Sequence, residues 1–143
     1  MKYDDASWHY GGDFPSHLPN EAGATHIGMF VAWCLLNNLG SEFHLEEFSD
    51  ELNDLKNRKL TPGAWFINTC DEKFTDDDLS DEGNSFADFY YQNEKTKQYD
   101  NDYTDLLCQD LDFVYEVPDS WETYEKLAPK ILTQFKSWKK KNS

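Results

Sequence analysis

Cysteine is scarce in this chain, and its pattern argues against two common uses of the residue. The 143 residues contain three cysteines, Cys34, Cys70 and Cys108, which are widely separated and odd in number. Neither a disulfide framework nor a paired CxxC zinc site fits that spacing. We therefore expect free thiols in a reducing, cytoplasmic setting, with Cys34 an unreactive thiol inside an apolar helix.

Long apolar runs and familiar catalytic motifs are also missing. No stretch approaches the roughly 18 apolar residues of a membrane span, and the opening residues lack the basic and apolar regions of a signal peptide. The patterns HExxH and GxSxG, phosphate-binding glycine loops and EF-hand loops do not occur. We therefore expect no membrane partner, no cofactor, no resident metal and no catalysis.

Basic residues are few, and acidic residues are in excess. Lys and Arg number 13 against 28 Asp and Glu, which gives a formal charge of −15. Residues 120–143 hold six lysines and two glutamates, so this tail carries +4 and the rest of the chain −19. Such a field disfavours nucleic acid and speeds encounter with a basic partner, although a purely solubilising surface has the same composition.

The apolar pattern predicts a mainly α fold in a single helical domain, residues 1–143. His26 to Leu39 is apolar on nearly every side, as expected of a buried central helix. We expect a compact bundle of about six helices around it. Tyr3 to Pro15 has neither a helical nor a strand period and predicts an irregular N-terminal loop. At most a short extended segment is expected near Phe113 to Val117.

Caps and amphipathic spacing mark the other helices. Ser41 is a plausible cap of a helix whose apolar, buried side is predicted from residues at steps of three and four from Leu45 through Leu55. Thr61 is a cap followed by proline at the first helical position. Asp119 and Glu122 resemble a capping box at the start of the last helix. Pro129 should kink that helix or divide it.

Two acidic runs predict a surface that binds a basic protein. Exposed aromatics among the acids would supply anchors, because binding hot spots are enriched in Trp and Tyr. A solvated helix surface is the simpler alternative for either run. The candidate partner-binding residues are Glu46, Glu47, Asp50, Glu51 and Asp54 in the first run and Asp76, Asp77, Asp78, Asp81 and Glu82 in the second.

Histidines, acids and tryptophans near the start of the chain suggest an alternative site. They could converge in the pocket of a small metal- or ligand-binding enzyme, and Asp4 and Asp5 add carboxylates nearby. The competing structural explanation is that His9 and His26 are hydrogen-bonded residues that fix the N-terminal loop against the central helix. The candidate pocket residues are Trp8, His9, Asp13, His26 and Trp33.

A resemblance to a known family rests on five segments spread through most of the chain. They read YDDASWHYGGDFP, LPNEAGATHIGMFVAWC, TPGAWFINTCDEKF, LSDEGNSFADFYY and VPDSWETY. In these segments the chain resembles an uncharacterised family of small bacterial proteins encoded among polymorphic toxin and secretion-effector genes. The resemblance implies a cytoplasmic immunity protein that occludes a cognate toxin with a basic active-site cleft. It assigns no site residues.

Overall fold

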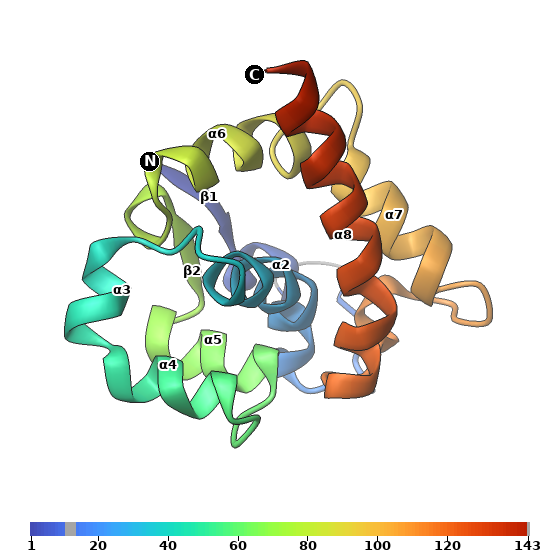
Figure 1. Cartoon of the computed structure of the whole chain (residues 1–143). Helices are drawn as coiled ribbons and strands as arrows, with labels where there is room; N and C mark the ends of the chain where they lie inside the picture. The colour runs from blue at the N-terminus through green and yellow to red at the C-terminus, as the bar shows by residue number, and fades with distance from the viewer. Residues whose placement is uncertain (11–13, 143) are drawn as a thin grey trace.

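The computed structural model describes residues 1–10 and 14–142, and this part of the chain is mainly helical, as the apolar pattern predicts (Figure 1). The elements run in the order β1 (Lys2–Asp5), α1 (Ala6–Tyr10), the 3-10 helix η1 (Asn20–Ala24), α2 (Thr25–Leu36), α3 (Glu42–Glu47), α4 (Ser49–Lys56), α5 (Pro62–Cys70), β2 (Lys73–Thr75), the 3-10 helix η2 (Asp76–Asp78), α6 (Asp81–Tyr90), α7 (Gln98–Leu107), the 3-10 helix η3 (Val114–Glu116) and α8 (Trp121–Lys141). Among these helices, none combines the length and apolar character that crossing a membrane requires.

Helix α2 is the centre of the fold, as predicted. Every residue from Thr25 to Leu35 is buried, and Figure 1 shows the helix nearly end-on, with α3, α4 and α5 on one side and α7 and α8 on the other. It ends at Leu36 rather than Leu39, because the amides of Asn37 and Leu39 both donate to the Cys34 carbonyl. Cys34 is a buried free thiol whose pKa is raised by burial.

The N-terminal segment is regular from Lys2 to Tyr10, which corrects the prediction of an irregular loop for that part of it. Strand β1 pairs antiparallel with β2, with Asp4 opposite Phe74 and Asp5 opposite Lys73, and α1 follows β1 without a break. Local sequence could not reveal this strand, because the strand that pairs with it, Lys73–Thr75, is distant in the sequence. Residues 11–13 lie outside the described part.

Two other predicted elements also differ. Phe113 to Val117 is not a strand, because Val114–Glu116 form η3 and the Glu116 carboxylate accepts the amides of Asp112 and Phe113. The helix expected from Ser41 to Leu55 is broken into α3 and α4 at Phe48, whose backbone is not helical.

The last helix differs from its prediction in its cap, and of the two predicted effects of its proline, division of the helix does not occur. Helix α8 runs continuously from Trp121 to Lys141 with Pro129 inside it, so the proline does not divide it. Its N-cap is Ser120, whose hydroxyl accepts from the Thr123 amide at 3.1 Å. The expected capping box of Asp119 and Glu122 was wrong.

Gly28 lies where α2 crosses the N-terminus of α5. A Cβ added there would sit 2.9 Å from the Pro62 carbonyl oxygen and 3.0 Å from the Gly63 Cα. Both neighbours are backbone atoms, which cannot turn aside as a side chain can. The absence of a side chain at Gly28 therefore sets how closely the two helices approach.

Gly28→Ala is expected to lower the free energy of unfolding by about 1–3 kcal/mol, the usual cost of overpacking. Alanine is intrinsically the better helix former by about 1 kcal/mol, so the crossing must outweigh that gain. Urea denaturation followed by circular dichroism measures the change. Ser85→Ala, at an exposed position of α6, is the control and should change stability by less than about 0.5 kcal/mol. A Gly28→Ala protein as stable as the wild type would contradict the close crossing.

Candidate functional site

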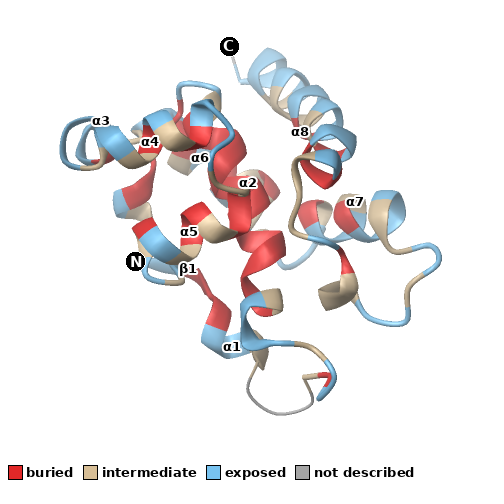
Figure 2. Cartoon of the chain, turned by 90° about the horizontal axis from the view of Figure 1, so that it is seen from below, coloured by how far each residue is buried: buried red, intermediate tan, exposed pale blue. Residues whose placement is uncertain are grey.

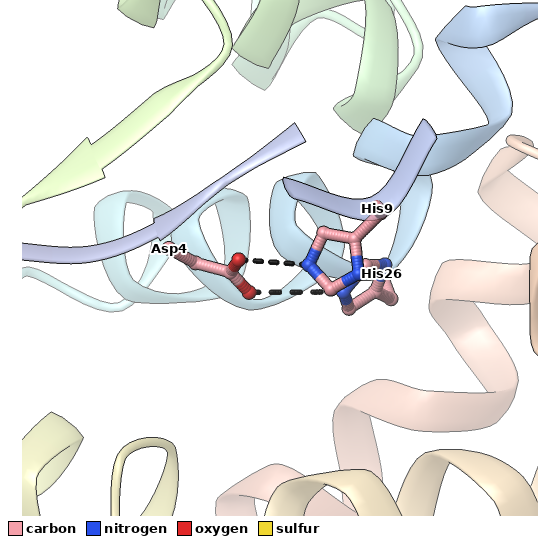
Figure 3. Close-up of side chains that lie close together, drawn as sticks. All are labelled: Asp4, His9 and His26. Carbon is pink, nitrogen blue, oxygen red and sulfur yellow. Dashed lines mark hydrogen bonds and ion pairs between the residues drawn. The ribbon is translucent and has the colours of Figure 1, made fainter. Parts of the chain in front are cut away.

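His9 and His26 meet at the carboxylate of Asp4, and we call these three residues the histidine–aspartate cluster (Figure 3). His9 Nε2 lies 2.8 Å from Asp4 Oδ1, and His26 Nε2 lies 3.7 Å from Asp4 Oδ2. The two imidazole rings contact each other edge to face, with centroids 4.4 Å apart. One carboxylate therefore faces the Nε2 atoms of both histidines.

Three different elements bring the cluster together. Asp4 is in β1, His9 is in α1, and His26 is in the first turn of α2. The turn from β1 into α1 is stabilised by Asp5, whose Oδ1 accepts from the Ser7 amide at 2.9 Å and the Ser7 hydroxyl at 2.7 Å. This turn places His9 next to the Asp4 carboxylate, and the buried helix α2 holds His26 beside His9, on the same side of that carboxylate.

Two tyrosines and a backbone amide form hydrogen bonds with Asp4 and His9. Asp4 Oδ2 accepts from the Tyr91 hydroxyl at 2.6 Å, and Asp4 Oδ1 accepts from the Asp5 amide at 2.8 Å. His9 Nδ1 lies 2.9 Å from the Tyr115 hydroxyl. Burial raises the pKa of Asp4, but the interactions with His26 and His9 outweigh it and hold that pKa well below its usual value. The buried carboxylate is therefore charged.

The cluster lies between two pockets. The larger, of about 710 Å³, is lined by Asp4, His9 and His26 together with Trp8 and Tyr91. The smaller, of about 180 Å³, lies against the same two histidines and also touches Tyr103 and Tyr115. His26 Nδ1 and the Tyr103 hydroxyl are both buried, and the described residues offer neither a hydrogen-bond partner. The cluster is thus accessible to a small ligand or ion.

The two predicted acidic runs lie side by side in the fold. Helix α3 contacts η2, the Ser41 amide donates to the Asp78 carbonyl, and Gly40 forms a β-bridge with Leu79. Figure 2 shows α3 at the edge of the molecule, largely exposed. The exposed members of the runs are Glu46, Glu47, Asp50, Asp77, Asp81 and Glu82, and Glu51, Asp54 and Asp76 are partly buried.

Two large apolar side chains are exposed among these acids. On α3, Phe43 is 49% exposed and Leu45 is 51% exposed, and they flank the buried His44. Leu45 was expected on the buried side of its helix, and that expectation was wrong. We call Phe43, Leu45, Glu46, Glu47 and Asp50 the α3 face.

Comparison with known families matches residues 2–117 to a model described as a domain of unknown function, DUF7832. The chain belongs to the DUF7832 family. Comparisons with curated proteins and with solved structures gave no match. Membership of an uncharacterised family is what the five segments predicted. The DUF7832 region contains the histidine–aspartate cluster, both of its supporting tyrosines and the α3 face, and it ends before α8.

Of the predicted pocket residues in this DUF7832 domain, His9 and His26 converge and Trp8 lines the larger pocket. Trp33 does not, because its side chain is 1% exposed and packs in the core. Asp13 lies outside the described residues. Asp4 was not among the predicted pocket residues, because in the sequence it is one of several carboxylates near the histidines.

The tyrosines that support the cluster had no sequence signal. Tyr91 and Tyr115 are separated from their partners Asp4 and His9 by 87 and 106 residues. Only the folded DUF7832 domain brings them into hydrogen-bonding distance, so neither local spacing nor composition could have revealed them.

Asp78 was assigned to the binding surface of the DUF7832 domain, and that assignment was wrong. It is buried, its Oδ1 lies 2.8 Å from His44 Nε2, and its Oδ2 accepts from the Thr75 amide at 2.9 Å. Cys70 Sγ approaches the same His44 nitrogen at 4.0 Å, and burial raises the pKa of its thiol far above the usual value. A nucleophile–base–acid relay needs a different ring nitrogen for each partner, so these three residues join α3, α5 and η2 structurally.

Proposed function

We propose that this DUF7832 protein is an immunity-type inhibitor, which covers the basic active-site cleft of a cognate toxin with its α3 face and performs no catalysis of its own. The observation that supports this most is the pairing of exposed Phe43 and Leu45 with exposed carboxylates on one short helix. Apolar anchors surrounded by polar groups are the usual anatomy of a protein interface. We also propose a cytoplasmic location, where the three free thiols stay reduced.

Charge explains how such a face would find its partner. Residues 1–119 carry −19, so a basic protein is attracted from a distance before any contact forms. The exposed acids Glu46 and Glu47 are on the same short helix as the apolar pair, and the exposed Asp50 follows in the first turn of α4. Charged rims mainly raise the association rate, whereas buried apolar anchors mainly lower the dissociation rate.

The α3 face is also held in place before binding. Although α3 has only six residues, its buried side is tied to η2 by the His44–Asp78 contact at 2.8 Å, and Phe43 packs on Phe48 with ring centroids 5.1 Å apart. A face that is already ordered loses less conformational entropy on binding. This favours a stoichiometric inhibitor over a segment that folds on contact.

The experiment begins with affinity capture of the tagged protein from its native cell lysate at low salt, with proteins identified as salt is raised. A single basic toxin-like protein in stoichiometric amount is the expected partner. The double reversal Glu47→Lys with Asp50→Lys should then slow its association by at least about 10-fold at low salt, and much less at high salt. Phe43→Ala should speed dissociation and weaken the binding free energy by about 2 kcal/mol.

A matched control separates the α3 face from net charge. Asp105→Lys with Asp110→Lys makes the same change in total charge at exposed positions at and beyond the end of α7, on the opposite side of the molecule from α3 (Figure 1). This variant should retain most of the association rate. Equal slowing by the two double variants, or no slowing by the first, would remove the α3 face from the interface.

A further inference from the structure

We infer that Asp4, His9 and His26 form a binding site for a divalent transition metal, Zn²⁺, with an open coordination position facing the larger pocket. One donor atom from each residue lies within 4.8 Å of the other two. Figure 3 shows the two imidazoles on the same side of the carboxylate, each turned toward it. The cluster shares no residue with the α3 face, so the inference stands independently of the proposed inhibitor function.

The donor atoms have the right chemistry and nearly the right spacing. Zn²⁺ binds histidine nitrogen and carboxylate oxygen at about 2.0–2.2 Å, which places neighbouring donors of a tetrahedral site roughly 3.4 Å apart. In the cluster, His9 Nε2 and His26 Nε2 lie 2.8 and 3.7 Å from different oxygens of the Asp4 carboxylate, and one donor atom from each residue lies within 4.8 Å of the other two. Shifts of under about 1 Å in the side chains would therefore bring all three donors onto one ion.

The hydrogen bonding of His26 favours a metal over a purely structural role. A buried imidazole that only stabilises the fold is expected to have at least one ring nitrogen in a hydrogen bond, as His44 has with Asp78. His26 is 8% exposed, yet Nε2 is 3.7 Å from Asp4, beyond an ordinary hydrogen bond, and Nδ1 has no partner among the described residues. A metal ion would give Nε2 a partner. The Tyr103 hydroxyl also has no hydrogen-bond partner among the described residues, and water in the smaller pocket would connect it to His26 Nδ1.

The partners of His9 suit a metal ligand. Without metal, His9 Nε2 donates to the Asp4 carboxylate, because a charged carboxylate can only accept, and in the neutral ring Nδ1 then accepts from the Tyr115 hydroxyl. When Nε2 binds a metal instead, the ring proton moves to Nδ1, and the same tyrosine oxygen can accept it, because a hydroxyl both donates and accepts. Hydrogen bonds from the second nitrogen of a metal-bound histidine normally fix its tautomer and orientation in this way.

A metal ion bound by the cluster would have one side facing the larger pocket. Asp4, His9 and His26 all line the larger pocket of about 710 Å³, so an ion at their centre has a side that none of the described residues occupies as a ligand. Three protein ligands with a free fourth position are typical of zinc that binds water or a small ligand, whereas structural zinc is enclosed by four protein ligands. The structure thus points to a reactive site rather than to a structural one.

Zinc titration of the purified full-length chain, freed of metal by a chelator, tests the inference. Competition with a chromophoric chelator gives the affinity and stoichiometry, and one Zn²⁺ per chain is expected. His9→Gln should weaken binding by more than about 100-fold, and Tyr115→Phe, which removes only an outer partner, by about 10-fold. His17→Gln is the control, because His17 is exposed and lies 3.3 Å from Glu116, outside the cluster. It should bind as the wild type does.

Cobalt substitution distinguishes this cluster from the second group of possible ligands, His44, Cys70 and Asp78. Co²⁺ bound by Asp4, His9 and His26 should give visible bands without a thiolate-to-metal charge-transfer band. A thiolate band that Cys70→Ser removes would place the ion at the other group and overturn the inference. So would a wild-type chain that binds no Zn²⁺, or binding that neither His9→Gln nor Tyr115→Phe weakens. Circular dichroism checks that each variant folds, and Tyr115→Phe suffices for the test if His9→Gln does not.

Discussion

Trp33→Ala is expected to lower the free energy of unfolding by about 3–5 kcal/mol, the cost of removing a large aromatic side chain from a core. The indole is almost completely buried and contacts Phe86 and Phe135, with ring centroids 6.0 and 5.8 Å away. These rings come from α6 and α8, so the cavity would loosen the contacts of α2 with both helices. Guanidinium denaturation of the purified variant measures the loss.

The other tryptophan of the predicted pocket is the matched control. Trp8 is 59% exposed at the edge of the larger pocket, with Lys2 Nζ 5.5 Å from its ring centre. Trp8→Ala should cost less than about 1 kcal/mol, the value of an exposed cation–π contact. Similar losses for the two variants would contradict the assignment of Trp33 to the core.

The contrast between these tryptophans shows how far the sequence could predict the fold. A helix that is apolar on every side is expected to be buried, so the burial of α2 and its bounds to within a few residues were predictable. The same uniformity hides which side faces a pocket, and Trp33 was therefore placed wrongly. The caps Ser41 and Thr61 were predictable because capping is local, and both hydroxyls accept backbone amides at the starts of α3 and α5.

Features that depend on distant partners were not predictable. The strand Lys2–Asp5 exists because Lys73–Thr75 pairs with it. On α3, spacing alone turned Leu45 inward, but the helix break at Phe48 and the contact with Asp78 turn His44 inward instead. A buried polar residue with a partner 34 positions away overrides an apolar period that only a few residues define.

The candidate sites follow the same division. Asp4 and His9 are close because they lie in adjacent elements, β1 and α1, and both residues were noted from the sequence. His26 joins them because α2 passes behind the β1–α1 turn, and the two tyrosines arrive from later segments. The acidic runs were visible as composition, whereas the exposed pair Phe43 and Leu45 depends on how α3 is rotated.

Asp119→Ala is expected to lower the free energy of unfolding by about 2–3 kcal/mol, because it removes a charged acceptor from several donors at once. The carboxylate accepts from the Thr61 hydroxyl at 2.5 Å, the Gly63 amide at 2.8 Å and the Ala64 amide at 3.2 Å. All three donors are at the start of α5, where a negative charge is favourable. Asp119 thus caps a helix far from it in sequence and attaches the entry of α8 to the DUF7832 region.

Glu122 decides between this arrangement and the capping box that the sequence suggested. If Asp119 and Glu122 formed that box, Glu122→Ala and Asp119→Ala would destabilise the protein to a similar degree. In the folded chain Glu122 is exposed and its carboxylate only approaches Lys126, at 3.8 Å, so Glu122→Ala should leave the denaturation midpoint unchanged. Ser120→Ala removes the observed cap of α8 and should cost about 1 kcal/mol. The loss of unfolding free energy should therefore be largest for Asp119→Ala, smaller for Ser120→Ala and smallest for Glu122→Ala. The reverse order would contradict the contact of Asp119 with α5 and support the capping box at the start of α8.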